Sequence, residues 1–269
     1  MRDIVRTAKN SLIGGKTMKR IFIISCISLL LACNAFAERK GGSDMKPQND
    51  INAILSCFGY GYKVSVTING VPTSIKGGKS ESMRLFNQDN EMAKSAPPEM
   101  KKLFMLKPGE NQIQIEYKKE GTANDKLTLS LELEGYPAPV FLLYSAKKPS
   151  GKVTKSVILQ KAVPQDFKPV FISDEGENKS AFVHVSTMDA TITPILNNVK
   201  GMTLAGMPGS IPLEGVKPGK NELVIKYKAD PSSTKELKFA VITPEWKKFI
   251  TKKITDPSEK EEKFTFNVK

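Results

Sequence analysis

The chain is poor in the side chains on which metal sites and most catalytic sites depend. Its 269 residues include one histidine, three cysteines and one tryptophan. Two of the cysteines, Cys26 and Cys33, lie in an apolar segment near the N-terminus, so Cys57 is the single cysteine of the remaining chain. One histidine and one cysteine cannot make up the usual His/Cys ligand sets, and one cysteine cannot form an intramolecular disulfide. We therefore expect no metal, no cofactor and a fold that depends on its apolar cores.

The motifs of common catalytic sites are missing as well. The sequence has neither a phosphate-binding glycine loop nor a G-x-S-x-G motif. His184 lies in the alternating segment 182–185, where a structural role is expected. The acidic segment 174–177 lacks the ligand spacing of a calcium loop and is expected to be a solvated turn. Cys57 lies in an apolar stretch, which favours a buried, unreactive thiol. The sequence thus predicts that the protein is not an enzyme, with a carboxylate-based hydrolase as the remaining catalytic alternative.

The N-terminal apolar run is too short to cross a membrane comfortably. Residues 21–32 supply about a dozen residues, whereas a spanning helix needs about 20. A Lys-Arg pair precedes this run, and Ala-Phe-Ala at 35–37 follows it with the small-x-small pattern of a cleavage site. Residues 18–37 are therefore predicted to be a secretory signal peptide, and residues 1–17 an extension upstream of its start.

An alternative processing pattern overlaps the same segment. Residues 30–33, Leu-Leu-Ala-Cys, resemble the lipobox of bacterial lipoproteins, in which the cysteine is acylated and becomes the mature N-terminus. Leu31 departs from the small or β-branched residue that is usual there. Cleavage after Ala37 predicts a protein of the periplasm or cell surface, whereas lipidation of Cys33 predicts one associated with a membrane. Both patterns place the body of the chain outside the cytoplasm.

The charge of the chain is positive but moderate. The formal net charge is +13, and +8 remains once residues 1–37 are removed. Such a charge attracts the protein mildly to anionic surfaces such as lipid head groups or acidic polymers. Because an exported protein seldom meets nucleic acid, we expect no nucleic-acid partner, and the charge favours a solvated, lysine-rich surface.

One thirteen-residue segment occurs twice, 110 residues apart. Residues 106–118 and 216–228 share seven identical positions, among them a Lys-Pro-Gly sequence. Proline followed by glycine suits the two central positions of a type II turn. The alternation of apolar and polar residues after the turn is that of a strand with one buried face. Each copy therefore predicts a tight turn that leads into a half-buried strand.

Further segments keep the same order around the two copies. An alternating segment ends at Asn69-Gly70, a strong hairpin signal, and Asn197-Asn198 takes the same place in the second copy. The alternating leucines of 127–133 correspond to apolar residues in 237–241 of the second copy. No segment shows a convincing helical period. The sequence predicts an all-β fold of two tandem antiparallel β-sandwich domains, immunoglobulin-like or jelly-roll, related by internal duplication.

The domain boundaries follow from the repeat. Residues 38–50 are predicted to be a flexible N-terminus, 51–162 the first domain and 163–269 the second, with a hinge within 161–170. The first copy carries an insertion of roughly 18 residues. This insertion lies in the polar, Gly/Pro-rich segment 76–101, which we expect to be irregular and either disordered or a binding loop.

Two aromatic residues occupy equivalent places after a strand. Tyr136 and Trp246 lie 110 residues apart and are the candidates for contact with a ligand, as a stacking platform for a sugar or a partner. The equivalence also fits a large side chain that fills the same gap in each domain, which is the favoured interpretation.

A family resemblance rests on the two best-preserved segments. Val-x-Val-x-Ile-Asn-Gly at 64–70, followed by Leu-Lys-Pro-Gly-Glu-Asn-x-Ile-x-Ile at 106–115, resembles β-sandwich accessory modules of carbohydrate-active enzymes. The Leu-x-Pro-Gly part is also similar to fibronectin type III and other immunoglobulin-like domains. Gln112 and Glu222 depart from the fibronectin pattern, which has an aromatic residue there. The resemblance covers about 40 residues per copy, implies a sandwich fold and assigns no binding residues.

These observations favour a non-catalytic, exported binding or adhesion protein of the bacterial cell envelope. Its partner would be an envelope glycan or protein. The first alternative is a structural or assembly subunit that pairs exposed strand edges with partner strands. The hydrolase is the second alternative, and the sequence does not fix the oligomeric state.

Overall fold

The fold is all-β, with several separate sheets. The computed structural model describes residues 51–122, 124–186, 190–229, 236–243, 245, 247–253 and 258–269. All of these belong to one compact unit, which spans 48–269. The predicted signal peptide, the flexible N-terminus, Cys33 and Trp246 lie outside the described residues, and the predictions made for them stay predictions. In the described part, no helix combines the length and the apolar character that a membrane crossing requires.

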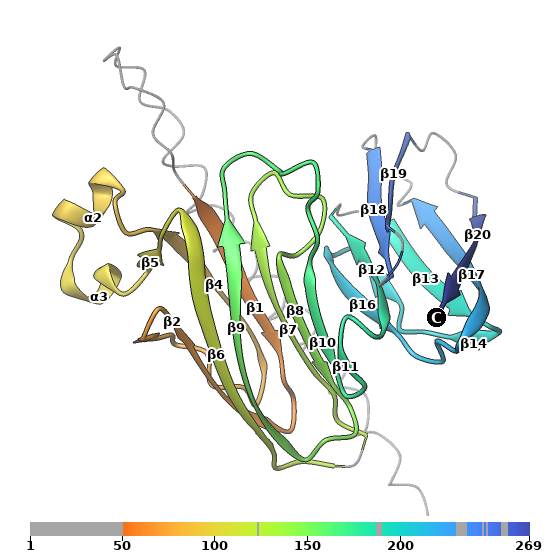
Figure 1. The fold of residues 1–269 in the computed structure, drawn as a ribbon, viewed down its shortest axis with the longest axis horizontal. Coiled ribbons are helices and arrows are strands. Elements are labelled where there is room, and N and C mark those ends of the chain that lie inside the picture. The colour runs from red at the N-terminus through yellow and green to blue at the C-terminus, as the bar shows by residue number, and fades with distance from the viewer. Residues whose placement is uncertain are drawn as a thin grey trace, which may run out of the picture. The chain divides into compact units, whose positions relative to one another are not determined.

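Two sheets come from the N-terminal part of the unit, and Figure 1 labels all of their strands except β3. Sheet A has seven strands in the order β11 (Gly176–Glu177), β10 (Val170–Ser173), β8 (Phe141–Ser145), β7 (Leu127–Leu133), β1 (Asn52–Phe58), β4 (Ser80–Asn87) and β5 (Phe104–Leu106). Sheet B has four strands in the order β3 (Val71–Pro72), β2 (Tyr62–Ile68), β6 (Gly109–Lys119) and β9 (Ser150–Leu159). Pairing is antiparallel except that β10 runs parallel to β8 and β5 to β4.

The C-terminal part forms two further antiparallel sheets. Sheet C has the order β16 (Gly209–Leu213), β12 (Ala181–Val185), β18 (Glu236–Ile242) and β19 (Lys247–Lys253). Sheet D has the order β14 (Val199–Lys200), β13 (Ala190–Leu196), β17 (Gly219–Ala229) and β20 (Lys260–Val268), and β15 (Leu204–Ala205) pairs with β13. The order β8-β7-β1-β4 of sheet A recurs in sheet C as β19-β18-β12-β16, and the order in sheet B recurs in sheet D.

The alternating apolar residues of these strands form two clusters. The leucines of β7 are buried, as predicted, and pack in the first cluster with apolar side chains of β1, β2 and β6. The second cluster joins alternate residues of β12 and β18 to those of β13 and β17. The intervening residues Phe182, Ala240 and Ile242 point to the other face of sheet C and belong to the first cluster. An apolar contact therefore links sheet C to the first cluster.

The glycines of the Lys-Pro-Gly turns have the positive φ that the sequence predicts. Gly109 and Gly219 have φ of 87° and 82°, the positive values that a type II turn requires at its second central residue. In the first copy, Asn111 is completely buried and its Nδ2 donates to the carbonyl oxygens of Lys107 at 2.7 Å and Gly109 at 3.0 Å. Asn221 makes the same two bonds, at the same distances, to Lys217 and Gly219.

A second asparagine ties each turn to the preceding hairpin. Asn69 has φ of 51°, and its Nδ2 donates to Asn111 Oδ1 at 2.8 Å. Asn197 has φ of 48° and donates to Asn221 Oδ1 at the same distance. The side-chain oxygen of Asn69 accepts from the Gln112 backbone at 3.0 Å. The predicted equivalence of the two hairpin turns is therefore confirmed in backbone conformation and in hydrogen bonding.

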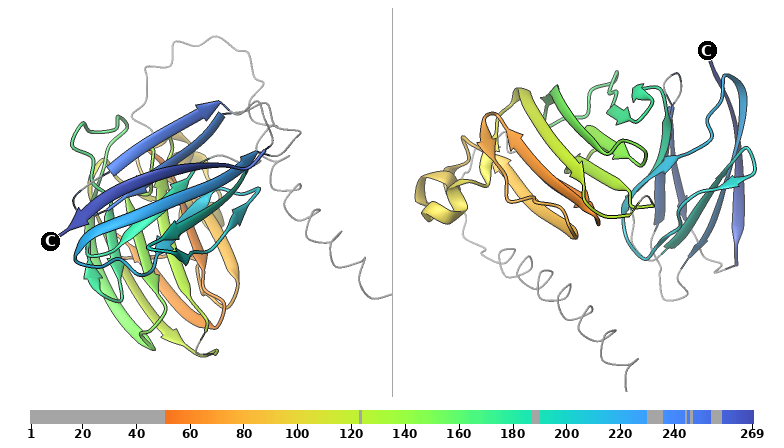
Figure 2. Two further views of the ribbon diagram at one scale, coloured as in Figure 1. Left: turned by 90° about the vertical axis from the view of Figure 1, so that its right-hand side faces the viewer. Right: turned by 90° about the horizontal axis from the view of Figure 1, so that it is seen from below.

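The expectation of an irregular segment over 76–101 is wrong for much of its length. β4 occupies Ser80–Asn87 and pairs with β1, burying Met83 and Leu85. Its apolar pattern is short and its other face is polar, so the alternation was easily missed. Two short helices follow, α2 (Glu91–Ser95) and α3 (Pro98–Lys101), and in Figures 1 and 2 they lie beside β5. With five and four residues, neither is long enough to show a helical period.

The β10–β11 hairpin lies after the predicted boundary at residue 163 but pairs within sheet A. Its register sets Phe171 beside Leu142 and Ile172 beside Leu143 of β8. Phe171 then contacts Phe182 of β12 edge-to-face, with ring centroids 5.1 Å apart. The chain thus passes from sheet A to sheet C within the few residues between β11 and β12. The division into domains at 162/163 stays a prediction.

Candidate functional site

The thiol of Cys57 lies in the first apolar cluster. It is completely buried in β1, and burial, together with the negative charge of Glu81, raises its pKa to about 12. A nucleophilic cysteine needs the opposite, a pKa lowered by a cationic or helix N-terminal environment. The predicted burial of Cys57 is confirmed, and its surroundings keep the thiol protonated and inert.

His184 is buried as well, and its ring lies on β12 beside β16. It is 3% exposed, and its Nδ1 lies 3.1 Å from Ser210 Oγ. Burial lowers the pKa of His184 to about 4, against the opposing effect of a hydrogen bond with the Gly209 backbone. The imidazole is therefore neutral at pH 7, enclosed by protein and held by a hydroxyl.

The carboxyl groups of Glu132 and Glu214 have pKa values moved in opposite directions. Burial raises the pKa of Glu132, although a hydrogen bond from Ser130 Oγ at 3.0 Å works against this. The pKa of Glu214 is lowered, first by the hydrogen bond from Lys126 and then by that from Tyr144. In the part of the chain that the structure describes, no group of three or more His, Cys, Asp or Glu side chains is arranged to hold a metal.

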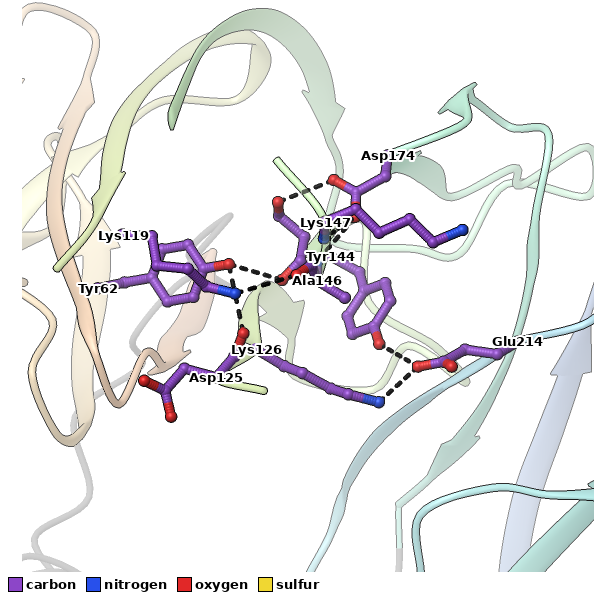
Figure 3. Close-up of polar contacts among 10 residues, drawn as sticks. Tyr62, Lys119, Asp125, Lys126, Tyr144, Ala146, Lys147, Asp174 and Glu214 are labelled. Carbon is purple, nitrogen blue, oxygen red and sulfur yellow. Dashed lines mark hydrogen bonds and ion pairs between the residues drawn. The ribbon is translucent and has the colours of Figure 1, made fainter. Parts of the chain in front are cut away.

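The carboxylate of Glu214 joins sheet C to sheet A. It follows β16, and its Oε1 accepts hydrogen bonds from Tyr144 Oη and Lys126 Nζ, both at 2.5 Å (Figure 3). Burial and the neighbouring Glu214 raise the pKa of Tyr144, so the phenol stays a donor. The side chains of Lys126 and Glu214 are each 54% exposed, so the ion pair itself contributes little, about 0–1 kcal/mol. This contact stabilises a junction and offers no catalytic group.

Asp174 holds the end of strand β8. Its carboxylate accepts from the backbone N–H of Ala146 at 2.7 Å, from that of Lys147 at 2.6 Å and from Ser145 Oγ at 2.8 Å (Figure 3). Burial alone raises the pKa of this carboxyl, but the hydrogen bonds from Lys147, Ala146 and Ser145 lower it overall. The acidic segment 174–177 was expected to be a solvated turn. Residues 174–175 do form a turn, between β10 and β11, and Asp174 in addition caps the loop that follows β8.

Strand β19 corresponds to β8 in the second half of the chain. The register pairs Leu129 of β7 with Leu143 of β8, and Phe239 of β18 with Ile250 of β19. Leu129 and Phe239 are equivalent through the 110-residue offset. Leu143 therefore corresponds to Ile250, and the preceding residue, Leu142, corresponds to Phe249.

The outer edges of these two strands differ. β8 pairs with β7 on one side and with β10 on the other, whereas in the described ranges β19 pairs with β18 alone. Leu142 is completely buried, and Phe249 at the equivalent place is 43% exposed. Lys247 Nζ lies 5.9 Å from the centre of the Phe249 ring and donates to the Phe167 carbonyl. The outer edge of β19, residues 247–253, is the candidate binding site.

The sequence-predicted ligand contact Tyr136 is almost buried. It is 9% exposed, its hydroxyl donates to the Gln160 carbonyl at 2.9 Å, and its ring meets Phe167 edge-to-face with centroids 5.0 Å apart. This environment fits the favoured interpretation of a space-filling residue. A ligand contact at Tyr136 stays a prediction, as does one at Trp246.

A cavity of about 250 Å³ lies where β10, β12 and the start of β19 meet. Its lining combines the apolar side chains of Phe171, Phe182 and Ile242 with the polar ones of Lys168 and Lys247. Sites for drug-sized ligands usually enclose about 300–1,000 Å³. The cavity is therefore small, and its importance here is that it adjoins the first residue of β19.

Comparisons of the chain with protein-family models, with curated proteins and with solved structures found no match. The edge of β19 is not among the sites predicted from the sequence. A signal for it was available in Lys-Lys-Phe-Ile-Thr-Lys-Lys at 247–253, because lysines concentrated on a short apolar strand are typical of an exposed sheet edge.

Proposed function

We propose that the protein is a non-catalytic, exported binding protein of the bacterial cell envelope that binds a protein partner by strand addition. One observation carries this proposal. β19 has a neighbour on one side in the described residues, while its counterpart β8 has neighbours on both, and the apolar Phe249 is left half-exposed on β19. Main-chain hydrogen bonds to an added strand give affinity, and alternate side chains give specificity.

Tandem β-sandwich domains related by duplication are the architecture that we propose for this binding protein. Support comes from the repeated strand orders and from the matched hydrogen bonds of Asn111 and Asn221. A buried asparagine with the same donors, acceptors and distances in both copies is hard to obtain from turn chemistry alone. The sandwich arrangement is supported by two apolar clusters, one drawn mainly from sheets A and B and the other from sheets C and D.

The catalytic alternative receives little support from the described side chains. Cys57 and His184 are buried in states that do not suit a nucleophile or a base. The carboxylates of Asp174 and Glu214 are occupied by backbone, lysine and tyrosine donors. A hydrolase would need a pair of carboxyl groups with matched roles facing a substrate cleft.

The protein-binding proposal is tested by photo-crosslinking from the edge of β19. A photoreactive residue replaces the exposed Thr251 in the full chain, and the matched control carries it at the exposed Ser156 on edge strand β9. We expect a defined envelope protein to crosslink from 251 and not from 156. Equal products from both positions, or none from 251, would contradict the proposal.

Export is tested separately by mass spectrometry of the mature N-terminus. A chain that starts at Glu38, or one with an acylated Cys33, agrees with the proposal and fixes where the protein acts. An intact N-terminus retained in the cytoplasm would rule out export while leaving the strand-edge binding open to test.

A further inference from the structure

The partner of β8 within the chain shows what an added strand must contain. β10 runs parallel to β8, with Val170, Phe171 and Ile172 beside Phe141, Leu142 and Leu143. Phe171 is 2% exposed and Leu142 is completely buried, so these neighbours exclude water from each other. The segment that fills this edge is therefore an apolar triplet in an extended conformation.

An acidic residue completes the fit just after the triplet. Asp174 follows β10 and accepts two backbone N–H groups and one hydroxyl at the end of β8. Hydrogen bonds of this type, with an ionised acceptor, are about twice as strong as neutral ones. The capping carboxylate fixes the register as well, because it fits at one place along the edge.

The edge of β19 offers matching chemistry. Phe249 and Ile250 take the places of Leu142 and Leu143, and Ile250 packs against the second apolar cluster. The strand also carries lysines at 247, 248, 252 and 253. Lys252 pairs with Glu262 at 2.6 Å and Lys247 contacts Phe167, while Lys248 is exposed. A strand that approaches this edge gains from an acidic residue at either end.

We infer that the outer edge of β19 accepts, in parallel orientation, a partner segment made of three apolar residues followed by an acidic residue. This inference rests on the proposed function and specifies its partner. A second copy of this chain is a poor donor, because its own segment of this kind, residues 170–174, is already paired with β8 and tied to the loop after it. The occupant is therefore a strand of a different protein.

The test uses the chain's own segment as the probe. A fluorescent peptide with the sequence of residues 168–178 is titrated into the full-length processed protein and followed by fluorescence anisotropy. We expect saturable binding. Phe249→Asp should weaken it at least about tenfold, as the loss of a central apolar anchor does, whereas Ile158→Asp on the exposed face of β9 should leave it unchanged.

A second peptide tests the acidic position. Replacing the aspartate that corresponds to Asp174 with lysine should weaken binding at least about fivefold, because a charge-assisted cap becomes a repulsion beside the lysines of β19. Phe249 is exposed, so its substitution leaves the fold intact, and circular dichroism confirms this for each variant.

Three results would overturn the inference. The first is the absence of saturable binding. The second is binding that Phe249→Asp does not weaken, which would mean that the peptide binds β8 by displacing β10. The third is crosslinking from position 251 to a second copy of the chain. The proposed function fails separately, when position 251 crosslinks to no envelope protein. If crosslinking succeeds and the peptide does not bind, the partner is recognised by different side chains.

Discussion

Asn111 in the first half of the chain and Asn221 in the second half each stabilise a Lys-Pro-Gly turn. They do so through equivalent hydrogen bonds of the same length. The outer edges of β8 and β19 are not matched in this way. β8 is flanked on both sides, and β19 has β18 as its neighbour among the described strands. Features that hold each half together are thus repeated, and features that face outward differ. The difference directs the search for function to the edges.

The largest effects should come from equivalent core positions, one in each half. Leu129→Ala and Phe239→Ala remove buried side chains from β7 and β18, and we expect losses of about 2–5 and 3–5 kcal/mol in the free energy of unfolding. Because Phe182, Ala240 and Ile242 join sheet C to the first cluster, both variants should lower one shared transition in calorimetry. Two separate transitions, each sensitive to one variant, would show that the halves unfold independently.

The two buried asparagines offer the most direct comparison. Asn111→Ala and Asn221→Ala each leave the same three backbone groups of the turn without their side-chain partners. Each should cost about 3 kcal/mol, since an unsatisfied buried polar group costs about 1–3 kcal/mol. Chemical denaturation measures both. Costs that differ by more than about 1 kcal/mol would show that one turn can relax and the other cannot.

The pH dependence of stability should differ between the two halves because of His184. The equivalent residue of the first half, on β1, is Ser56, which does not titrate. The folded pKa of about 4 lies below the ordinary 6.5, so the unfolded chain binds the proton first. The contribution of His184 to the free energy of unfolding is therefore fully present above pH 6.5, and it is lost as the pH falls toward 4. The loss should reach about 2–3 kcal/mol.

His184→Ser, which copies the residue of the first half, isolates this contribution in denaturation curves at pH 7 and 4.5. Burial raises the pKa of Glu132, so acidification increases the stability that this residue contributes and opposes the effect of His184. Because wild type and variant both contain Glu132, its effect cancels when the two proteins are compared. If wild type and variant lose the same stability on acidification, the imidazole is not the source of the dependence.

The junction contact should matter less. Tyr144→Phe removes one hydrogen bond to Glu214 from a partly exposed site, and we expect a loss of about 1 kcal/mol. Lys126→Met gives the matched comparison, with an expected loss of at most about 1 kcal/mol because the pair is exposed. Thermal unfolding of the two variants ranks them. A cost for Lys126→Met that exceeds that of Tyr144→Phe would reverse this ranking.

The smallest effect on stability is expected at the open edge. Phe249→Ser should change the free energy of unfolding by no more than about 0.5 kcal/mol, since the side chain is half-exposed. Leu142→Ser on the edge covered by β10 should cost several times more. Denaturation of the two variants tests whether the edges differ energetically, and equal costs would mean that Phe249 is already well packed.

Local patterns in the sequence predicted the elements with strict alternation or strong turn chemistry. Leu127–Leu133 and the turns at Gly109 and Gly219 follow from side-chain period and from positive φ. β4 was missed because Met83 and Leu85 are its two buried apolar residues. The helices α2 and α3 were missed because one turn of helix carries no periodic signal.

Long-range pairing could not be read from local patterns. The parallel register of β10 beside β8 joins residues about 30 apart, and nothing in Val-Phe-Ile-Ser states which strand it will meet. The cap by Asp174 depends on that pairing, so the acidic segment looked like an ordinary turn. The candidate site at β19 is defined by the lack, in the described residues, of a neighbour equivalent to β10. That difference is evident only from a comparison of β19 with β8.

The parallel orientation at the edge of β8 has a consequence for symmetry. A strand added in parallel from a downstream segment joins two different surfaces, a donor and an acceptor, so the contact is heterologous and no twofold axis can relate its two sides. Contacts of this kind do not give a symmetric homodimer. They assign fixed roles, in which this chain receives a strand and a different protein supplies it.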